Sequence, residues 1–367
     1  MSFVAPPYPY ERLGDLARAA SHHEGGPVDC SIGTPCDPPL RAVIDELAKG
    51  VGARGYPPSQ GTPDYRDAAS QWMNRRFGLN IGPDQLAACI GTKEFVGSLA
   101  GYLHLRTPER DTVLYPAVSY PTYAMGATLA GLRSVPVRMV AGRLDLDSIA
   151  PSDVERALVL WSNSPSNPTG HLDDLEAHAR WGRRHAVLVA SDECYAEFTW
   201  ASRPRSILEY GLHGVIAVHS VSKRSNLAGV RAGFYAGDPE VVAFLRLVRQ
   251  HAGLMVAAPV QAAVALAYRD DAHVEVQRSL YHERLELMSS ALHDFGVDAP
   301  MPEGSFYLWC SKTGMDGWQI GAALAEASGL IVSPGELYGE AGHDFARVAV
   351  VQPTDRLELV AQRLRTR

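Results

Sequence analysis

A lysine flanked by hydroxyl side chains is the first candidate for chemistry in this chain. Lys223 comes shortly after the apolar run 214–219, which is typical of a buried parallel strand. Ser220, Ser222 and Arg231 lie near it in the sequence, and they supply hydroxyl donors and a planar cation that suits phosphate. Such a set suits a phosphate-bearing aldehyde cofactor held by the lysine. The alternative is a solvent-exposed loop with ordinary surface charges.

An aspartate at the end of a second apolar run is the second candidate for chemistry. Asp192 follows residues 187–191, and Tyr195 comes three residues later. Buried carboxylates are rare unless they are paired. An aspartate against a pyridinium nitrogen would keep that nitrogen protonated, so that the ring accepts electrons. The alternative is a strand-end acid that caps the next turn.

Three further segments offer groups that bind anions. Asn167 lies in the turn-rich segment 163–170, where it could donate to a phenolic oxygen or hold a carboxylate. Thr92 and Lys93 open a predicted helix, whose N-terminal amides suit a phosphate. Arg347, in a predicted strand, could clamp a carboxylate with its two nitrogens. The plainer alternatives are a turn, an ordinary helix start and a surface cation.

The elements that would position these residues alternate between strand and helix. Helices are predicted at 39–49, 63–77, 91–105, 120–130 and 172–185, after an irregular segment at 1–36. Alternation of this kind predicts an α/β fold in which helices sandwich a mostly parallel central sheet. The predicted strands of that sheet are 86–90, 112–115, 135–140, 157–161, 186–191, 215–219 and 231–236.

Beyond residue 259 the pattern changes to longer helices and a few short strands. We expect a large cofactor-binding α/β domain at 42–265. We expect residues 1–41 and 266–367 to form a small α+β domain together. Its predicted helices are 259–268, 273–295, 318–328 and a last one from 355, and its predicted strands are 330–333 and 346–351.

Composition narrows the possible function classes. The 367 residues carry a net charge of −7, which argues against a nucleic-acid partner. Five scattered cysteines favour a reducing, cytoplasmic location, and no apolar run is long enough to span a membrane. His22 and His23 fit a polar turn better than a metal site, so no metal is expected. No G-x-G-x-x-G follows the first strand, which disfavours a nicotinamide dehydrogenase.

The ordered motifs resemble those of the class I/II aminotransferases, which are fold-type-I pyridoxal 5′-phosphate enzymes. They are the segments Asn167-Pro-Thr-Gly170, Asp192-Glu-Cys-Tyr195, Ser220-Val-Ser-Lys223 and Gly229-Val-Arg-Ala-Gly233, followed by the late Arg347. The resemblance covers nearly the whole chain. It implies an aspartate aminotransferase-like fold and pyridoxal 5′-phosphate as the cofactor.

The resemblance also implies a role for each matching residue. Lys223 matches the catalytic lysine that binds the cofactor covalently and moves the proton, and Asp192 matches the partner of the pyridinium nitrogen. Tyr56 matches a residue that reaches the phosphate of the other subunit, which implies a homodimer with shared active sites. The other matches are Tyr195 and Asn167 at the phenolic oxygen, Tyr120 against the ring, Thr92, Lys93, Ser220, Ser222 and Arg231 at the phosphate, and Arg347, Asn167 and Gly33 at the substrate carboxylate.

Within the family, the pattern is most similar to the succinyldiaminopimelate aminotransferases of lysine and diaminopimelate biosynthesis. The cues are residues 55–63, 91–94 and 119–123. The implied reaction moves an amino group between N-succinyl-LL-2,6-diaminopimelate and 2-oxoglutarate. The alternatives are a broad-range or aromatic amino acid aminotransferase, a carbon–sulfur lyase and a non-catalytic ligand sensor. Arg138 and Arg224 are possible partners for a distal carboxylate, although surface positions suit both better.

Overall fold

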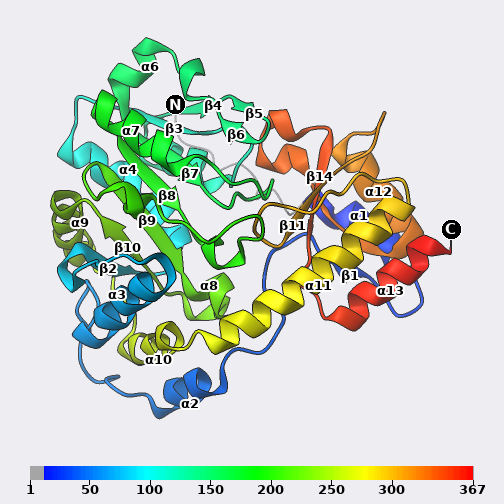
Figure 1. The fold of residues 1–367 in the computed structure, drawn as a ribbon, viewed down its shortest axis with the longest axis horizontal. Coiled ribbons are helices and arrows are strands. Elements are labelled where there is room, and N and C mark those ends of the chain that lie inside the picture. The colour runs from blue at the N-terminus through cyan, green and yellow to red at the C-terminus, as the bar shows by residue number, and fades with distance from the viewer. Residues whose placement is uncertain (1–11, 367) are drawn as a thin grey trace.

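The structure is a computed structural model that describes residues 12–366. Its larger part is built around a seven-stranded sheet with the order β2-β10-β9-β8-β7-β3-β4 (Figure 1). In this sheet β10 is antiparallel to its neighbours β2 and β9, and the other pairings are parallel. The expected mostly parallel sheet is therefore confirmed. The strands span Leu86–Cys89 (β2), Thr112–Pro116 (β3), Arg133–Val137 (β4), Ala157–Asn163 (β7), Leu188–Asp192 (β8), Val215–Ser220 (β9) and Gly233–Gly237 (β10).

Each face of the sheet has its own apolar core, because successive strand residues point to opposite faces. Val189 and Val215 pack on one face against helices α3, α7 and α10. Ala190 and Ile216, the next residues along the same strands, pack on the other face against α4, α5 and α9. The helices span Pro63–Phe77 (α3), Thr92–Arg106 (α4), Thr122–Leu129 (α5), Leu175–His185 (α7), Pro239–His251 (α9) and Ala258–Arg269 (α10), with α2 (Arg41–Lys49) packed on α10.

A second, smaller group of elements follows α10 in the chain (Figure 1). Its three-stranded antiparallel sheet has the order β11-β14-β13, and the long helix α11 packs against α13. A separate apolar core joins these elements. They span Ala272–Asp294 (α11), Tyr307–Ser311 (β11), Gly317–Ser328 (α12), Leu330–Ile331 (β12), Ser333–Pro334 (β13), Phe345–Ala349 (β14) and Thr354–Arg365 (α13).

The N-terminal part of the described chain packs on this smaller group. Strand β1 (Val28–Asp29) pairs in parallel with β12, and helix α1 (Gly14–Ala20) contacts α12. The apolar residues Leu13 and Leu16 are buried there beside Ile331. Residues 1–11 lie outside the described part of the chain.

Most predicted elements are confirmed to within a few residues, and α3 has the predicted bounds 63–77. Among the described residues, four helices lie outside the predicted set, namely α1, α6 (Pro151–Arg156), α8 (Val221–Arg224) and α9. The expected irregular segment at 1–36 is wrong for Gly14–Ala20, because burial of Leu16 and Ala20 stabilises a helix there. The domain boundaries after residues 41 and 265 stay a prediction. Within residues 12–366 no helix has both the length and the apolar character that crossing a membrane requires.

Candidate active site

A cavity of about 380 Å³ lies where the parallel strands of the large sheet end. Residues that follow the carboxyl ends of β2, β3, β7, β8 and β9 line it, and Arg231, which precedes the antiparallel β10, reaches the same edge. Ligands of open α/β sheets bind at this edge. Of the predicted site residues, all but Tyr56 line the cavity.

Lys223 projects into the cavity from the short helix α8 (Val221–Arg224), which directly follows β9. Its Nζ donates a hydrogen bond to the carbonyl of Gly33. Burial of the ammonium group, reinforced by the positive charge of Arg347, lowers the pKa of Lys223 to about 8. A lysine with such a pKa is neutral in a larger share of molecules at physiological pH, which is what a nucleophile or a general base needs.

Asp192 is buried at the end of β8 among polar groups that hold its carboxylate. The hydroxyl of Tyr123 donates to Oδ2 at 3.0 Å, and the amide of Cys194 donates to Oδ1 at 3.2 Å. The side-chain amide of Asn163 donates to the Asp192 carbonyl at 2.8 Å. Burial raises the pKa of Asp192, and the hydrogen bonds from Cys194 and Tyr123 oppose the shift. A cationic ring nitrogen beside it would favour the carboxylate form.

Arg347 lines the cavity from β14, with 1% of its surface exposed. Its Nη1 donates to Oδ1 of Asn167 at 2.7 Å, and its Nη2 donates to the carbonyl of Ser31 at 2.5 Å. The ring of Tyr307 lies 4.2 Å from the guanidinium carbon. A cation held at this depth is suited to a substrate carboxylate.

Tyr307 also explains why residue 33 is glycine. A Cβ at Gly33 would lie 2.2 Å from the Tyr307 hydroxyl, so a side chain there would displace that ring. The same hydroxyl lies 2.8 Å from the hydroxyl of Tyr195. Gly33, Tyr195 and Tyr307 therefore form one wall of the cavity together.

Hydroxyls, amides and cations gather at the end of the cavity where a phosphate is expected. The backbone amide of Ser222 donates to Oγ of Ser220 at 3.1 Å. Thr92 and Lys93 form the first turn of α4, and the backbone amides at a helix start favour an anion. A Cβ at Gly91 would lie 2.3 Å from Nη2 of Arg231, and Gly91 has φ +71°. The guanidinium can therefore lie over the start of α4 only because residue 91 has no side chain.

Sequence reasoning missed several cavity residues. Tyr123, which contacts Asp192, lies three residues after the predicted Tyr120, and the rings of the two tyrosines meet edge to face. Cys194, which lies within the predicted motif 192–195, also lines the cavity, and its Sγ donates to Oγ1 of Thr92 at 3.2 Å. A tyrosine near a strand end was a signal for Tyr123, whereas nothing local in the sequence marks Tyr307.

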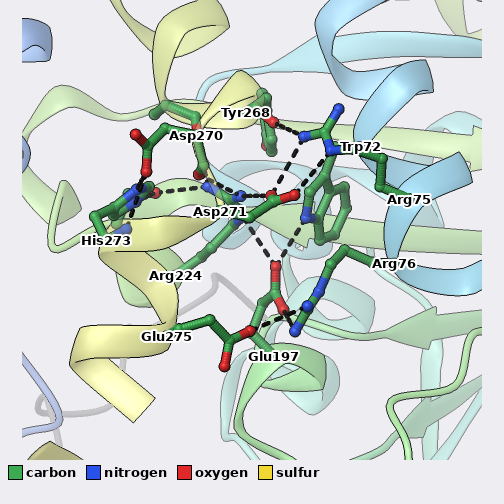
Figure 2. Close-up of polar contacts among 12 residues, drawn as sticks. Trp72, Arg75, Arg76, Glu197, Arg224, Tyr268, Asp270, Asp271, His273 and Glu275 are labelled. Carbon is green, nitrogen blue, oxygen red and sulfur yellow. Dashed lines mark hydrogen bonds and ion pairs between the residues drawn. The ribbon is translucent and has the colours of Figure 1, made fainter. Parts of the chain in front are cut away.

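Three residues named from the sequence do not line the cavity. Tyr56 is 97% exposed in the single chain, so its expected role toward a partner subunit stays a prediction. Arg138 is mostly exposed and pairs with Asp145. The surface position expected for Arg224 is wrong, because this arginine is buried among charged side chains outside the cavity (Figure 2).

The residues present fit the cofactor that the motifs imply. The cavity volume is in the range of small-molecule sites. It combines an amine of lowered pKa, a buried carboxylate and a cation-lined helix start, which match the aldehyde, the ring nitrogen and the phosphate of pyridoxal 5′-phosphate.

Comparison with known proteins points to the same chemistry. A family model described as aminotransferase class I and II matches residues 27–364. The 4-dedimethylamino-4-oxo-anhydrotetracycline transaminase OxyQ of Streptomyces rimosus is 40% identical, over 98% of this chain and 99% of the relative. An LL-diaminopimelate aminotransferase of Desulforudis audaxviator is 33% identical, over 100% of this chain and 98% of the relative. Among solved structures, a probable N-succinyldiaminopimelate aminotransferase of Thermus thermophilus has a TM-score of 0.85 and 30% identity, covering 97% of this chain and 99% of that one.

Proposed function

The chain belongs to the class I and II aminotransferases and is a pyridoxal 5′-phosphate-dependent transaminase, and from this premise we propose its substrates and the role of each site residue. The proposed reaction moves an amino group between N-succinyl-LL-2,6-diaminopimelate and 2-oxoglutarate. The observation that carries the proposal is the convergence of Lys223, Asp192 and Arg347 on one cavity.

The proposed roles follow from the contacts of each side chain. When bound, the cofactor supplies an aldehyde that attaches to an amine and a ring that accepts electrons. Lys223 holds the cofactor and moves the proton of the substrate α-carbon, a task that its pKa of about 8 favours. Asp192, held by Tyr123 and by the amide of Cys194, keeps the ring nitrogen protonated.

The remaining residues bind and orient. Arg347 and Asn167, which are already joined at 2.7 Å, take the α-carboxylate together with the backbone at Gly33. Holding this carboxylate fixes which bond to the α-carbon faces Lys223. We assign Tyr120 to the ring face and Tyr195 to the phenolic oxygen. The phosphate is assigned to Thr92, Lys93, Ser220, Ser222 and Arg231.

The substrate assignment rests on the relatives that this chain resembles. The names of two relatives, an LL-diaminopimelate aminotransferase and a probable N-succinyldiaminopimelate aminotransferase, favour a diaminopimelate-type amino donor. The 40% identity to OxyQ favours a second candidate, in which the amino acceptor is the ketone of a polycyclic compound. In both candidates the α-carboxylate of an amino acid would occupy the site at Arg347.

The deciding experiment follows the absorbance of the cofactor-loaded protein as single amino donors are added. N-succinyl-LL-diaminopimelate, LL-diaminopimelate, glutamate and phenylalanine are each tested for conversion of the cofactor to its amine form. Conversion by the succinylated donor and glutamate alone would support the proposal. The amine form is then mixed with 2-oxoglutarate or with 4-dedimethylamino-4-oxo-anhydrotetracycline, and turnover of the polycyclic ketone would favour the second candidate. Conversion by phenylalanine would overturn the substrate assignment but not the reaction class.

A further inference from the structure

Arg224, the residue after Lys223, lies at the centre of a buried cluster of charged side chains (Figure 2). Only 2% of its surface is exposed, and it does not line the cavity. Successive side chains of a helix project about 100° apart. Arg224 therefore leaves the α8 turn in a different direction from the lysine that lines the active site.

The guanidinium of Arg224 uses every donor that it has. An arginine has five N–H groups in a rigid plane, and five contacts fix this plane here. The rings of Trp72 and Tyr268 lie beside it, 5.4 and 5.6 Å from the guanidinium carbon. The acceptors are Glu197 Oε1 (3.1 Å), Ser225 Oγ (3.1 Å), the carbonyls of Ala267 (2.6 Å) and Asp270 (3.1 Å), and Asp271 Oδ1 (3.0 Å).

The two acidic partners of Arg224 are themselves held in place. Glu197 accepts a hydrogen bond from Nε1 of Trp72 at 2.8 Å and pairs with Arg76 at 2.6 Å. Asp271 accepts from Nε of Arg75 at 2.8 Å. These interactions, drawn in Figure 2, tie Arg224 to helix α3 as well as to its direct partners.

Arg224 thus connects three places in the fold. It belongs to α8, which carries Lys223. Glu197 belongs to the 3-10 turn that follows Tyr195 at the end of β8. Asp271 and the two carbonyls lie where α10 ends and α11 begins, between the large sheet and the smaller group of elements.

A positional role explains this cluster better than a stabilising one. A buried ion pair adds little stability compared with apolar residues of the same size, because its charges lose their hydration. Helix α8 has a single turn (Val221–Arg224), which is too short to be stable by itself. Lys223 has a flexible side chain, so the direction of its amine depends on where this turn holds its Cα.

We propose that Arg224 is a positioning residue that fixes the α8 turn and thereby aims Lys223 at the reacting atoms. The proposal rests on the role proposed for Lys223. Misplacement of a reacting group by about 1 Å costs roughly a hundredfold in rate, so a small loosening of this turn has a measurable effect. Glu197 and Asp271 act through Arg224 in the same way.

The test replaces Arg224 by lysine in the full-length, cofactor-loaded protein. The R224K variant keeps the charge but loses the planar fork, because a lysine has three donors at one point. We expect kcat to fall about tenfold, with the KM of the amino donor changed less than twofold. We also expect the visible circular dichroism per bound cofactor to fall by half or more, since this signal reports how rigidly the cofactor is held.

Arg284→Lys is the matched control. Arg284 is also 2% exposed, pairs with Asp37 through both terminal nitrogens at 2.6 and 2.7 Å, and does not line the cavity. We expect R284K to lower the melting temperature at least as much as R224K does, with kcat and circular dichroism within twofold of the unchanged protein. Should R224K not fold, Glu197→Gln loosens the same cluster while keeping its size, and we expect a threefold or larger fall in kcat.

Two outcomes separate this proposal from the proposed function. Borohydride reduction followed by peptide mapping identifies the lysine that carries the cofactor. A label on another lysine would overturn the role of Lys223 and the positioning proposal with it. A label on Lys223, combined with an unchanged kcat and circular dichroism in R224K or E197Q, would overturn the positioning proposal alone and leave the cluster a purely structural feature.

Discussion

The chemistry of Lys223 depends on the residues that surround its amine. Burial and the nearby Arg347 both disfavour the ammonium form, and they lower the pKa to about 8 from an ordinary value of 10.5. Between pH 8 and pH 10.5, Lys223 is neutral in the folded protein, whereas the same lysine in an unfolded chain still binds a proton. Lys223 therefore makes the free energy of unfolding increase as the pH rises from about 8 to 10.5. Below pH 8 the lysine is protonated in both states and contributes no pH dependence.

We expect the amine of Lys223 in cofactor-free protein to react with an amine-directed reagent with a midpoint near pH 8. Lys49, whose hydrogen bond to Glu46 raises its pKa, and Lys223 itself in denaturant should both show midpoints above about pH 10. Mass spectrometry of peptides labelled at a series of pH values measures this. A midpoint for Lys223 in the folded protein that equals the midpoint in denaturant would contradict the charge environment described here.

Arg347→Lys tests the proposed carboxylate site. Lysine keeps the positive charge but cannot donate two parallel hydrogen bonds. A hydrogen bond to a charged group contributes about 1.5–3 kcal/mol, so we expect kcat/KM for the amino donor to fall about 10- to 100-fold, mostly through KM. Steady-state kinetics of R347K against Arg138→Lys, an exposed cation that pairs with Asp145, gives the comparison. Equal KM values for the two variants would remove Arg347 from substrate binding.

At the residue scale, the sequence predicted side chains that follow apolar runs, because the end of a buried strand is readable from local pattern alone. Lys223, Asp192 and Asn167 were found in this way. Tyr307 was not, because its contact with Tyr195 joins residues that are far apart in the chain. The buried position of Arg224 was missed for the same reason, since its partners lie on α10, α11 and the turn after β8.

At the scale of elements, the site depends on the junction between β2 and α4, where residue 91 is a glycine and has no side chain. Gly91 links β2 to α4 with φ +71° and ψ 154°, a conformation that is essentially restricted to glycine. The absence of a Cβ also leaves room for the guanidinium of Arg231. Gly91 therefore both allows the backbone turn between β2 and α4 and leaves space for Arg231 at the proposed phosphate site.

We expect Gly91→Ala to weaken binding of the cofactor at least tenfold, because the new Cβ displaces Arg231. Gly78→Ala is the control: Gly78 ends α3 with the same φ of +71°, and no atom lies within 4 Å of a Cβ built there. That variant should lose about 1–2 kcal/mol of stability, the cost of a Cβ in the left-handed conformation, and keep its cofactor affinity. Equilibrium titration with pyridoxal 5′-phosphate measures both. Equal affinities in the two variants would show that Arg231 does not need this space.

Capping residues and prolines mark the starts of some helices in the sequence. Helix α3 has Thr62 as a cap, whose hydroxyl accepts the amide of Tyr65, and a proline in its first turn. Helix α9 has similar signals, with Asp238 accepting the amides of Glu240 and Val241 before Pro239 begins the helix. Its start was therefore readable although it was not predicted. Helix α1 has no side-chain cap, and burial against α12 decides its conformation.

At the scale of the whole molecule, the segment after β1 joins the two groups of elements at the active site. The carbonyl of Ser31 accepts Nη2 of Arg347 from the smaller group, and the carbonyl of Gly33 accepts Nζ of Lys223 from the large sheet. The sequence indicated that the N-terminal region returns to the C-terminal part. It did not indicate these two backbone contacts, because a carbonyl has no residue-specific signal.

The exposed surface around Tyr56 bears on the predicted homodimer. Tyr56 is 97% exposed and Val51 is 53% exposed, and Ile44 on α2 is 41% exposed. These three exposed apolar side chains lie within residues 44–56, and exposed apolar surface is typical of protein contacts. The loop that carries Tyr56 is therefore suited to reach a second subunit.

We expect light scattering to give a mass of twice 39.7 kDa for the cofactor-loaded protein. Tyr56→Phe should raise the dissociation constant of the cofactor about fivefold without changing that mass, because it removes one hydroxyl from the proposed phosphate site of the other subunit and leaves the apolar surface intact. Tyr210→Phe removes a hydroxyl that accepts a hydrogen bond from Arg205 at 3.3 Å, away from the cavity, and should leave both the mass and the dissociation constant unchanged.

A single-chain mass together with an unaltered affinity in Y56F would contradict shared active sites, since a tyrosine this exposed cannot reach its own cavity without a rearrangement of the loop. A dimer in which Y56F binds the cofactor normally would keep the assembly and remove only the role of this hydroxyl.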